Sequence, residues 1–153
     1  MNRALLTASA LFLATIAGST DAQSACPADC ESSRLCDASV RDALPRLMRE
    51  QNLSYSSDVQ FQTFRRDLDG DPSTEEALIN LVSPHLCAPT LSCPTLVVVS
   101  RGGYVYTIGS GRLLTPLKST YRGWFDLGEQ EPSLFPFRYA VTRVVRFDGL
   151  RYR

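Results

Sequence analysis

The chain has 153 residues, of which 44% are hydrophobic and 21% are charged, and its 16 basic residues balance its 16 acidic residues. This composition is too apolar for an intrinsically disordered chain and suits one compact domain. Zero net charge excludes the broad basic surface of a non-specific nucleic-acid-binding protein, so nucleic acid is not an expected partner.

Residues 1–22 have the pattern of a secretory signal peptide. Arg3 gives a positive start, an apolar run extends from Ala4 to Ala17, and small residues follow up to Ala22. This run is shorter than the roughly 20 residues of a membrane span, and no later segment is apolar enough to cross a bilayer. We therefore expect an exported protein, periplasmic or secreted, with no transmembrane segment in its mature chain. An uncleaved amphipathic anchor is the alternative.

The five cysteines all follow this segment, and export makes disulfide bonds chemically available to them. They are Cys26, Cys30, Cys36, Cys87 and Cys93. The last two bracket a short loop and are the expected disulfide pair. The first three lie in an irregular leader over residues 23–36, where two can pair and one is left over. A zinc site is the alternative, although the spacings differ from the two-residue gap of common zinc sites.

The segment from residue 37 onward has helical periodicity. Its apolar residues fall on one face: Val40, Ala43, Leu44, Leu47 and Met48. Pro45 conflicts with an unbroken helix, which predicts a kink or a shorter helix beginning near Pro45. We expect this helix to pack on a sheet, and a membrane-surface or partner-docking helix is the alternative.

Beyond Gln51 the period of the apolar residues changes to two, which is typical of strands. Strands are expected at residues 59–63, 77–82, 95–100, 104–108, 112–117, 124–127 and 139–147. Gly102-Gly103 is a hairpin signal, and Asp148-Gly149 is expected to turn the chain into residues 150–153. The pattern predicts an α+β fold that is mostly β, with one N-terminal helix packed on an antiparallel sheet with tight hairpins. Residues 37–153 form this single expected domain.

A strongly acidic segment, residues 67–76, precedes the second expected strand. Its candidate metal ligands are Asp67, Asp69, Asp71, Glu75 and Glu76. Carboxylates at alternate positions of a tight turn suit Ca²⁺, which takes 6–8 oxygen ligands in irregular geometry, better than Mg²⁺. Glu75 is expected to close the site from the far side, with Glu76 as its competitor. The alternative is a solvated acidic turn held by Arg65 and Arg66.

This segment resembles the Asp-x-Asp-x-Asp-Gly-x-x-Asp calcium loops of FG-GAP (integrin-like) repeats, and more closely the Asp-Leu-Asn-Gly-Asp-Gly version found in many secreted bacterial domains. Asp67, Asp69 and Asp71 match the first three acidic positions, and Glu75 matches the last by spacing. The chain departs from the pattern at Pro72, where glycine is usual, and Glu76 suggests a one-residue insertion. The resemblance covers only the loop and the following strand, and it implies bound Ca²⁺.

The C-terminal segment is locally basic and contains interleaved aromatic residues. Arg143, Arg146 and Tyr152 are expected to form a partner face for an acidic envelope or extracellular protein or an anionic polymer, because arginine and tyrosine are enriched in binding hot spots. The alternative is the solvated face of an amphipathic strand.

Catalytic motifs are scarce, and His85 is the only histidine. The expected function is therefore an exported, non-catalytic binding module, such as an inhibitor or immunity-type protein, that inserts its Cys87–Cys93 loop into a partner. A small envelope hydrolase using the acidic loop or His85, and a structural accessory of an envelope assembly, are the alternatives.

Overall fold

The computed structural model describes residues 35–88, 92–133 and 138–153. The expected signal peptide over residues 1–22, and most of the leader with Cys26 and Cys30, lie outside the described residues.

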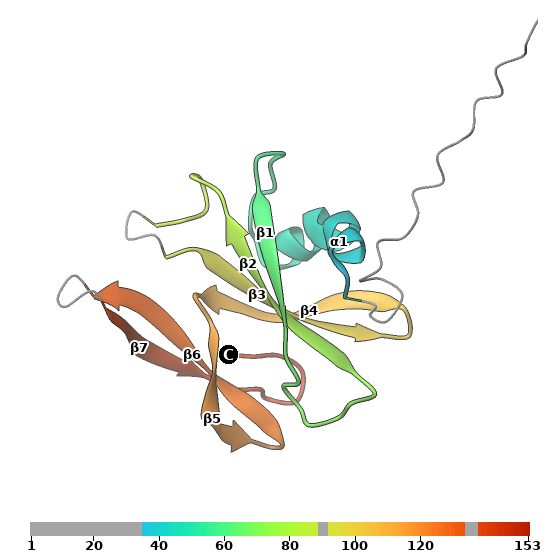
Figure 1. Ribbon diagram of the computed structural model, residues 1–153, viewed down its shortest axis with the longest axis vertical. Helices are drawn as coiled ribbons and strands as arrows, with labels where there is room; N and C mark the ends of the chain where they lie inside the picture. The colour runs from blue at the N-terminus through green and yellow to red at the C-terminus, as the bar shows by residue number, and fades with distance from the viewer. Residues whose placement is uncertain (1–34, 89–91, 134–137) are drawn as a thin grey trace, which may run out of the picture.

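The described chain contains one helix followed by seven strands. The helix is α1 (Asp37–Glu50), and the strands are β1 (Gln60–Arg65), β2 (Glu75–Val82), β3 (Pro94–Arg101), β4 (Tyr104–Arg112), β5 (Thr115–Tyr121), β6 (Trp124–Ser133) and β7 (Arg138–Val145). All neighbouring strands pair antiparallel. The expected α+β, mostly β class is confirmed, but the strands form two sheets, ordered β1-β2-β3-β4 and β5-β6-β7, rather than one. The helix covers one face of the first sheet, and the second sheet lies on the opposite face of that first sheet (Figure 1).

Helix α1 forms because its apolar residues recur at helical spacing and can all be buried against one sheet face. The buried side chains are Val40, Leu44, Leu47 and Met48. Pro45 lies inside the helix, which runs unbroken from Asp37, so the expected shorter helix beginning near Pro45 is wrong. Tertiary burial of four apolar side chains outweighs the unfavourable effect of an internal proline, which is about 3 kcal/mol.

Strand β3 is the centre of the domain, because both of its faces are buried. Leu96 and Val98 point into a core shared with α1, whereas Val97 and Val99 point into a second core shared with β6 and β7. Alternate residues of a strand point to opposite faces, so a continuous apolar run supplies both cores.

The tight turns follow from residues that accept a positive φ angle. Gly102 and Gly103 have φ angles of 59° and 84°, which confirms the expected two-residue hairpin between β3 and β4. Arg122 and Gly123 adopt a similar pair of angles, 56° and 86°, between β5 and β6.

The outer edge of β4 is covered by side-chain and backbone groups from distant segments. The Arg46 guanidinium of α1 donates to the Val105 carbonyl at 2.6 Å, and the Tyr152 amide donates to the Ile108 carbonyl at 2.6 Å. An exposed edge strand is a template for unwanted pairing between chains, and these bonds occupy it.

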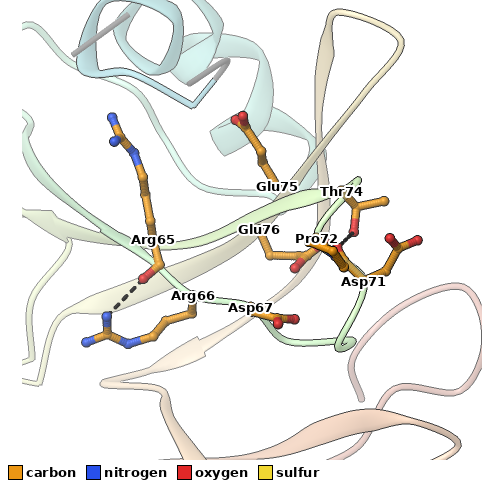
Figure 2. A pocket seen from close by; sticks show the side chains of 8 residues that line it. All are labelled: Arg65, Arg66, Asp67, Asp71, Pro72, Thr74, Glu75 and Glu76. Atoms are coloured by element: carbon orange, nitrogen blue, oxygen red, sulfur yellow. Dashed lines mark hydrogen bonds between the residues drawn. The ribbon is translucent and has the colours of Figure 1, made fainter. Parts of the chain in front are cut away.

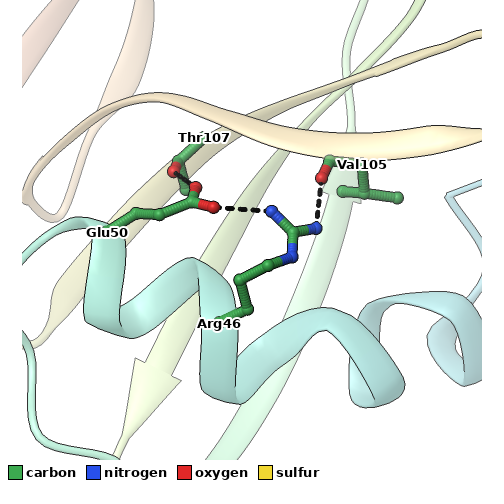
Figure 3. A network of polar contacts seen from close by, with 4 residues as sticks. All are labelled: Arg46, Glu50, Val105 and Thr107. Carbon is green, nitrogen blue, oxygen red and sulfur yellow. Dashed lines mark hydrogen bonds and ion pairs between the residues drawn. The ribbon is translucent and has the colours of Figure 1, made fainter.

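A polar network fixes the end of α1 on the same strand (Figure 3). Arg46 donates to Glu50 at 2.6 Å, and the Thr107 hydroxyl donates to the second Glu50 oxygen at 2.6 Å. The helix end is therefore tied to β4 by three side chains.

Cys87 and Cys93 form the expected disulfide bond, with an S–S distance of 2.05 Å. The Ala88 amide donates to the Ser92 carbonyl within the bridged loop, whose residues 89–91 lie outside the described residues. Cys36 is disulfide-bonded as well.

Replacing both Cys87 and Cys93 by serine is expected to lower the free energy of unfolding by about 2 kcal/mol, because the disulfide closes a short loop and so limits the conformations of the unfolded chain. Urea denaturation of the double variant under non-reducing conditions measures this loss and leaves the bond of Cys36 intact. A midpoint equal to that of the unaltered protein would contradict it.

Candidate functional site

The acidic loop between β1 and β2 is shaped by its own aspartates. The Gly70 amide donates to Asp67 Oδ1 at 2.6 Å, and the Asp71 amide donates to Asp69 Oδ1 at 2.8 Å. Gly70 has a φ of 76°, a left-handed conformation that glycine adopts without steric cost. The aspartates therefore turn the chain tightly, as their capacity for local backbone hydrogen bonds predicts.

Three carboxylates meet at this loop. Oxygens of Asp67, Asp69 and Glu76 all lie within 4.8 Å of one another. Asp67 is exposed, Asp69 is half-buried, and Glu76 is buried at the start of β2. The group therefore lies where an open loop meets the core.

Glu76 is the buried member of this group, with only 3% of its surface exposed. Its Oε2 accepts a hydrogen bond from the Leu68 amide at 3.1 Å, but its Oε1 has no hydrogen-bond partner. Burial raises the pKa of Glu76 and outweighs the opposite effect of the Thr74 hydroxyl and the Leu68 amide, and the negative charges of Asp69 and Asp67 add to the rise. An unpartnered buried carboxylate oxygen is unfavourable unless a proton or a cation compensates it.

Glu75 and Asp71, also expected as ligands, do not belong to this group. Glu75 and Glu76 are adjacent in β2, so their side chains leave opposite faces of the sheet. The Glu75 carboxylate accepts a hydrogen bond from the Leu35 amide at 3.1 Å on the helix side, and Figure 2 shows it pointing away from Glu76. Asp71 accepts from the Ser73 amide at 2.9 Å, and hydrogen bonding from Ser73 lowers its pKa.

A shallow hollow of about 360 Å³ opens beside Asp67 and Glu76 and is also lined by Arg65 and Arg66. Arg66 donates to the Arg65 carbonyl at 2.9 Å, and Arg65 donates to the Leu35 carbonyl at 3.5 Å. Within the described ranges, no ion pair joins either arginine to the three carboxylates. The expected alternative, a turn held by these arginines, therefore has no ion pair to support it.

Two further groups complete the loop. The Thr74 hydroxyl donates to the Asp69 carboxylate at 3.1 Å, and the Phe125 amide of β6 donates to the Leu68 carbonyl at 2.8 Å. Neither Thr74 nor Leu68 stood out in the sequence, because a hydroxyl and a backbone carbonyl carry no pattern of their own. The contact from Phe125 links the acidic loop to the second sheet.

The expected partner face is only partly a surface. Tyr152 is 5% exposed, and its hydroxyl donates to the Phe125 carbonyl at 2.8 Å, so its assignment to a partner face is wrong. Arg143 and Arg146 are exposed, but they meet different groups: Arg143 lies 3.8 Å from Glu129, and Arg146 lies 3.5 Å from Asp126.

Tyr152 instead anchors the C-terminal hairpin of residues 146–153. Its ring contacts those of Trp124 and Phe147, with centroids 6.1 Å and 5.5 Å away. The Phe147–Tyr152 bridge confirms the expected turn at Asp148-Gly149. A Cβ atom on Gly109 would lie 2.7 Å from Tyr152 Cβ, so glycine is required where the hairpin meets β4.

The residues around His85 do not form a hydrolase relay. The Ser83 hydroxyl is buried and donates directly to Asp58 at 2.8 Å, while His85 contributes its backbone amide at 3.4 Å. In a Ser-His-Asp relay the imidazole of the histidine lies between the serine and the acid. His85 itself is exposed on the turn after β2.

Helix α1, the one helix in the described part of the chain, is neither long enough nor apolar enough to cross a membrane. Comparison with protein-family models, with curated proteins and with solved structures finds no match to this chain.

Proposed function

We propose that this protein is an exported, non-catalytic binding module whose fold is stabilised by Ca²⁺ held by Asp67, Asp69 and Glu76. The observation that supports the proposal best is the buried Oε1 atom of Glu76, which lacks a hydrogen-bond partner and lies beside two further carboxylates. A cation at this point neutralises charge that the protein itself leaves uncompensated.

The donor set favours calcium over the other common divalent ions. All three side chains offer hard oxygen ligands, and backbone amides hold one oxygen each of Asp67 and Glu76 in place. Ca²⁺ accepts irregular arrangements of such oxygens and completes its shell with water or carbonyl groups, whereas Mg²⁺ demands near-octahedral geometry. The resemblance to FG-GAP calcium loops supports the same ion, with Glu76 in place of Glu75 as the closing ligand.

Export and a binding role complete the proposal. The Cys87–Cys93 bond is of the kind that persists in oxidising compartments, where calcium is also available at millimolar levels. The absence of an imidazole between Ser83 and Asp58 favours a binding role over the hydrolase alternative. An inhibitor or immunity-type protein is a concrete form of this role.

Adding millimolar Ca²⁺ to the metal-free protein is expected to raise its Tm by several degrees, because a ligand that binds only the folded state stabilises it. Differential scanning calorimetry in EGTA and in excess Ca²⁺ measures the shift, with Mg²⁺ expected to give a smaller one. Asp69→Asn should remove the shift. Asp42→Asn, the same change at an exposed position of α1, should retain it.

The calcium proposal fails if the Tm of the unaltered protein is the same in EGTA and in saturating Ca²⁺. It also fails if Asp69→Asn and Asp42→Asn respond to Ca²⁺ equally, because the ion would then be bound elsewhere.

A further inference from the structure

A polar groove of about 600 Å³ separates the end of α1 from the C-terminal hairpin. One wall is formed by residues 50–52, at and just after the end of α1, and the floor is formed by residues 107–110 of β4. The other wall is formed by residues 150–153 together with Arg143 of β7. The groove therefore brings together three segments that are far apart in the sequence.

Three arginines line this groove: Arg143, Arg151 and Arg153. Arg143 and Arg153 have side chains that are 62% and 58% exposed. Arg143 lies 3.8 Å from the Glu129 carboxylate, which is a long ion pair, and Arg151 makes no ion pair within the described residues. Their guanidinium groups thus retain donors that can meet a ligand.

The acidic lining residue is already neutralised by the protein. Both oxygens of Glu50 are occupied, one by Arg46 and the other by the Thr107 hydroxyl, each at 2.6 Å. Partial burial acts to raise the pKa of Glu50, but these bonds and the charge of Arg46 together lower it, so it stays ionised and paired. Glu129 and Asp148 offset part of the charge of Arg143 and Arg153, so the uncompensated positive charge of the groove lies mainly at Arg151.

The hairpin presents two of the arginines on a fixed support. Asp148 accepts hydrogen bonds from the amides of Leu150 and Arg151 at 2.9 and 3.0 Å, and its other oxygen lies 2.7 Å from Arg153 Nε. Tyr152, between the two arginines, is buried in the core, whereas Arg151 and Arg153 on either side of it are exposed. A support that is ordered before binding lowers the entropy lost on association.

We propose that this groove binds an acidic segment of a partner protein, whose carboxylates pair with Arg143, Arg151 and Arg153. Charge complementarity identifies the ligand as anionic, because guanidinium groups pair with carboxylates in bidentate geometry. Leu150, which also lines the groove, is 80% exposed and offers an apolar contact that a protein segment can use and a bare polyanion cannot. Arginine beside apolar surface is typical of protein interfaces. The inference rests on the proposed binding role and specifies its partner.

Charge reversal in the groove tests the inference with a matched control. Arg151→Glu is compared with Lys118→Glu, which makes the same change of net charge at an exposed position of β5 outside the groove. The probe is a short fluorescein-labelled peptide of aspartate and glutamate with one central leucine, measured by fluorescence anisotropy at physiological salt. Arg151→Glu is expected to weaken binding about tenfold, and Lys118→Glu to leave it within about twofold.

Each other outcome overturns the inference. Equal loss in both variants would show non-specific attraction to net charge. Tighter binding of polygalacturonate or polyphosphate than of the peptide would replace the acidic protein segment by an anionic polymer. No binding by the unaltered protein would remove the groove as an anion site. The Ca²⁺-induced Tm shift, recorded on the same samples, reports the calcium site independently, so failure of either proposal is recognised separately.

Discussion

Replacing Tyr152 by alanine is expected to lower the free energy of unfolding by about 3–5 kcal/mol, the usual loss for a large buried aromatic side chain. The ring packs against Trp124 and Phe147 in the core between the two sheets. The substitution also removes the hydrogen bond from the Tyr152 hydroxyl to the Phe125 carbonyl, which links the C-terminal hairpin to β6. Urea denaturation measures the change in stability.

Trp124 makes the local effect visible, because it is the only tryptophan in the chain. It stacks on Phe147 with a centroid distance of 4.1 Å, so detachment of the hairpin exposes it and shifts its emission to the red. Tyr152→Phe is the control, since it keeps the ring and loses only one hydrogen bond, about 1 kcal/mol. If the alanine variant is no less stable than the phenylalanine variant, Tyr152 is not the anchor of the hairpin.

Glu76→Gln is expected to reverse the order of stability between metal-free and calcium-loaded protein. In EGTA the variant removes a buried charge beside Asp67 and Asp69, which stabilises the fold by about 1–3 kcal/mol. In excess Ca²⁺ the unaltered protein gains binding free energy that the variant cannot, because an amide is a weaker ligand than a carboxylate. Urea denaturation under the two conditions measures both differences.

The pH dependence of stability in the unaltered protein and in Glu76→Gln separates the effect of the charge from that of packing. Because burial and the neighbouring Asp69 and Asp67 raise the pKa of Glu76, the folded protein binds more protons than the unfolded chain between the two pKa values. In EGTA, protonation of Glu76 therefore contributes to the free energy of unfolding. This contribution is gained as pH falls through the pKa of Glu76 in the folded protein, and it is lost as pH rises through the same value. The variant lacks this contribution, so the stability difference between the two proteins should shrink toward acid pH. If this stability difference does not vary with pH, Glu76 is not a buried group with a raised pKa.

The sequence predicted the individual elements better than their assembly. The helical spacing of Val40, Leu44 and Leu47 and the Gly102-Gly103 turn are local signals, and the structure confirms both. The division into two sheets was missed because strand length and alternation are local, whereas the sheet to which a strand belongs depends on contacts between distant segments. Helix α1 likewise continues through Pro45 because of burial that local rules do not count.

The sequence located the candidate metal centre, but whether Glu75 or Glu76 belongs to it depends on which face of β2 each residue occupies. Glu75 and Glu76 pair with Ser100 and Val99 of β3, so the strand begins earlier than residue 77 and includes both glutamates. A shift of one residue sends a side chain to the opposite face, and the spacing of the acidic residues alone does not say where the strand begins.

The central position of β3 has a consequence for how the domain loses its structure. Its alternating residues close two separate cores, so pulling either the helix or the second sheet away leaves one side of the same strand uncovered. Neither layer therefore has an apolar interior of its own to retain. The domain is built to melt as one cooperative unit, with the amide protons of β3 among the last to exchange with solvent.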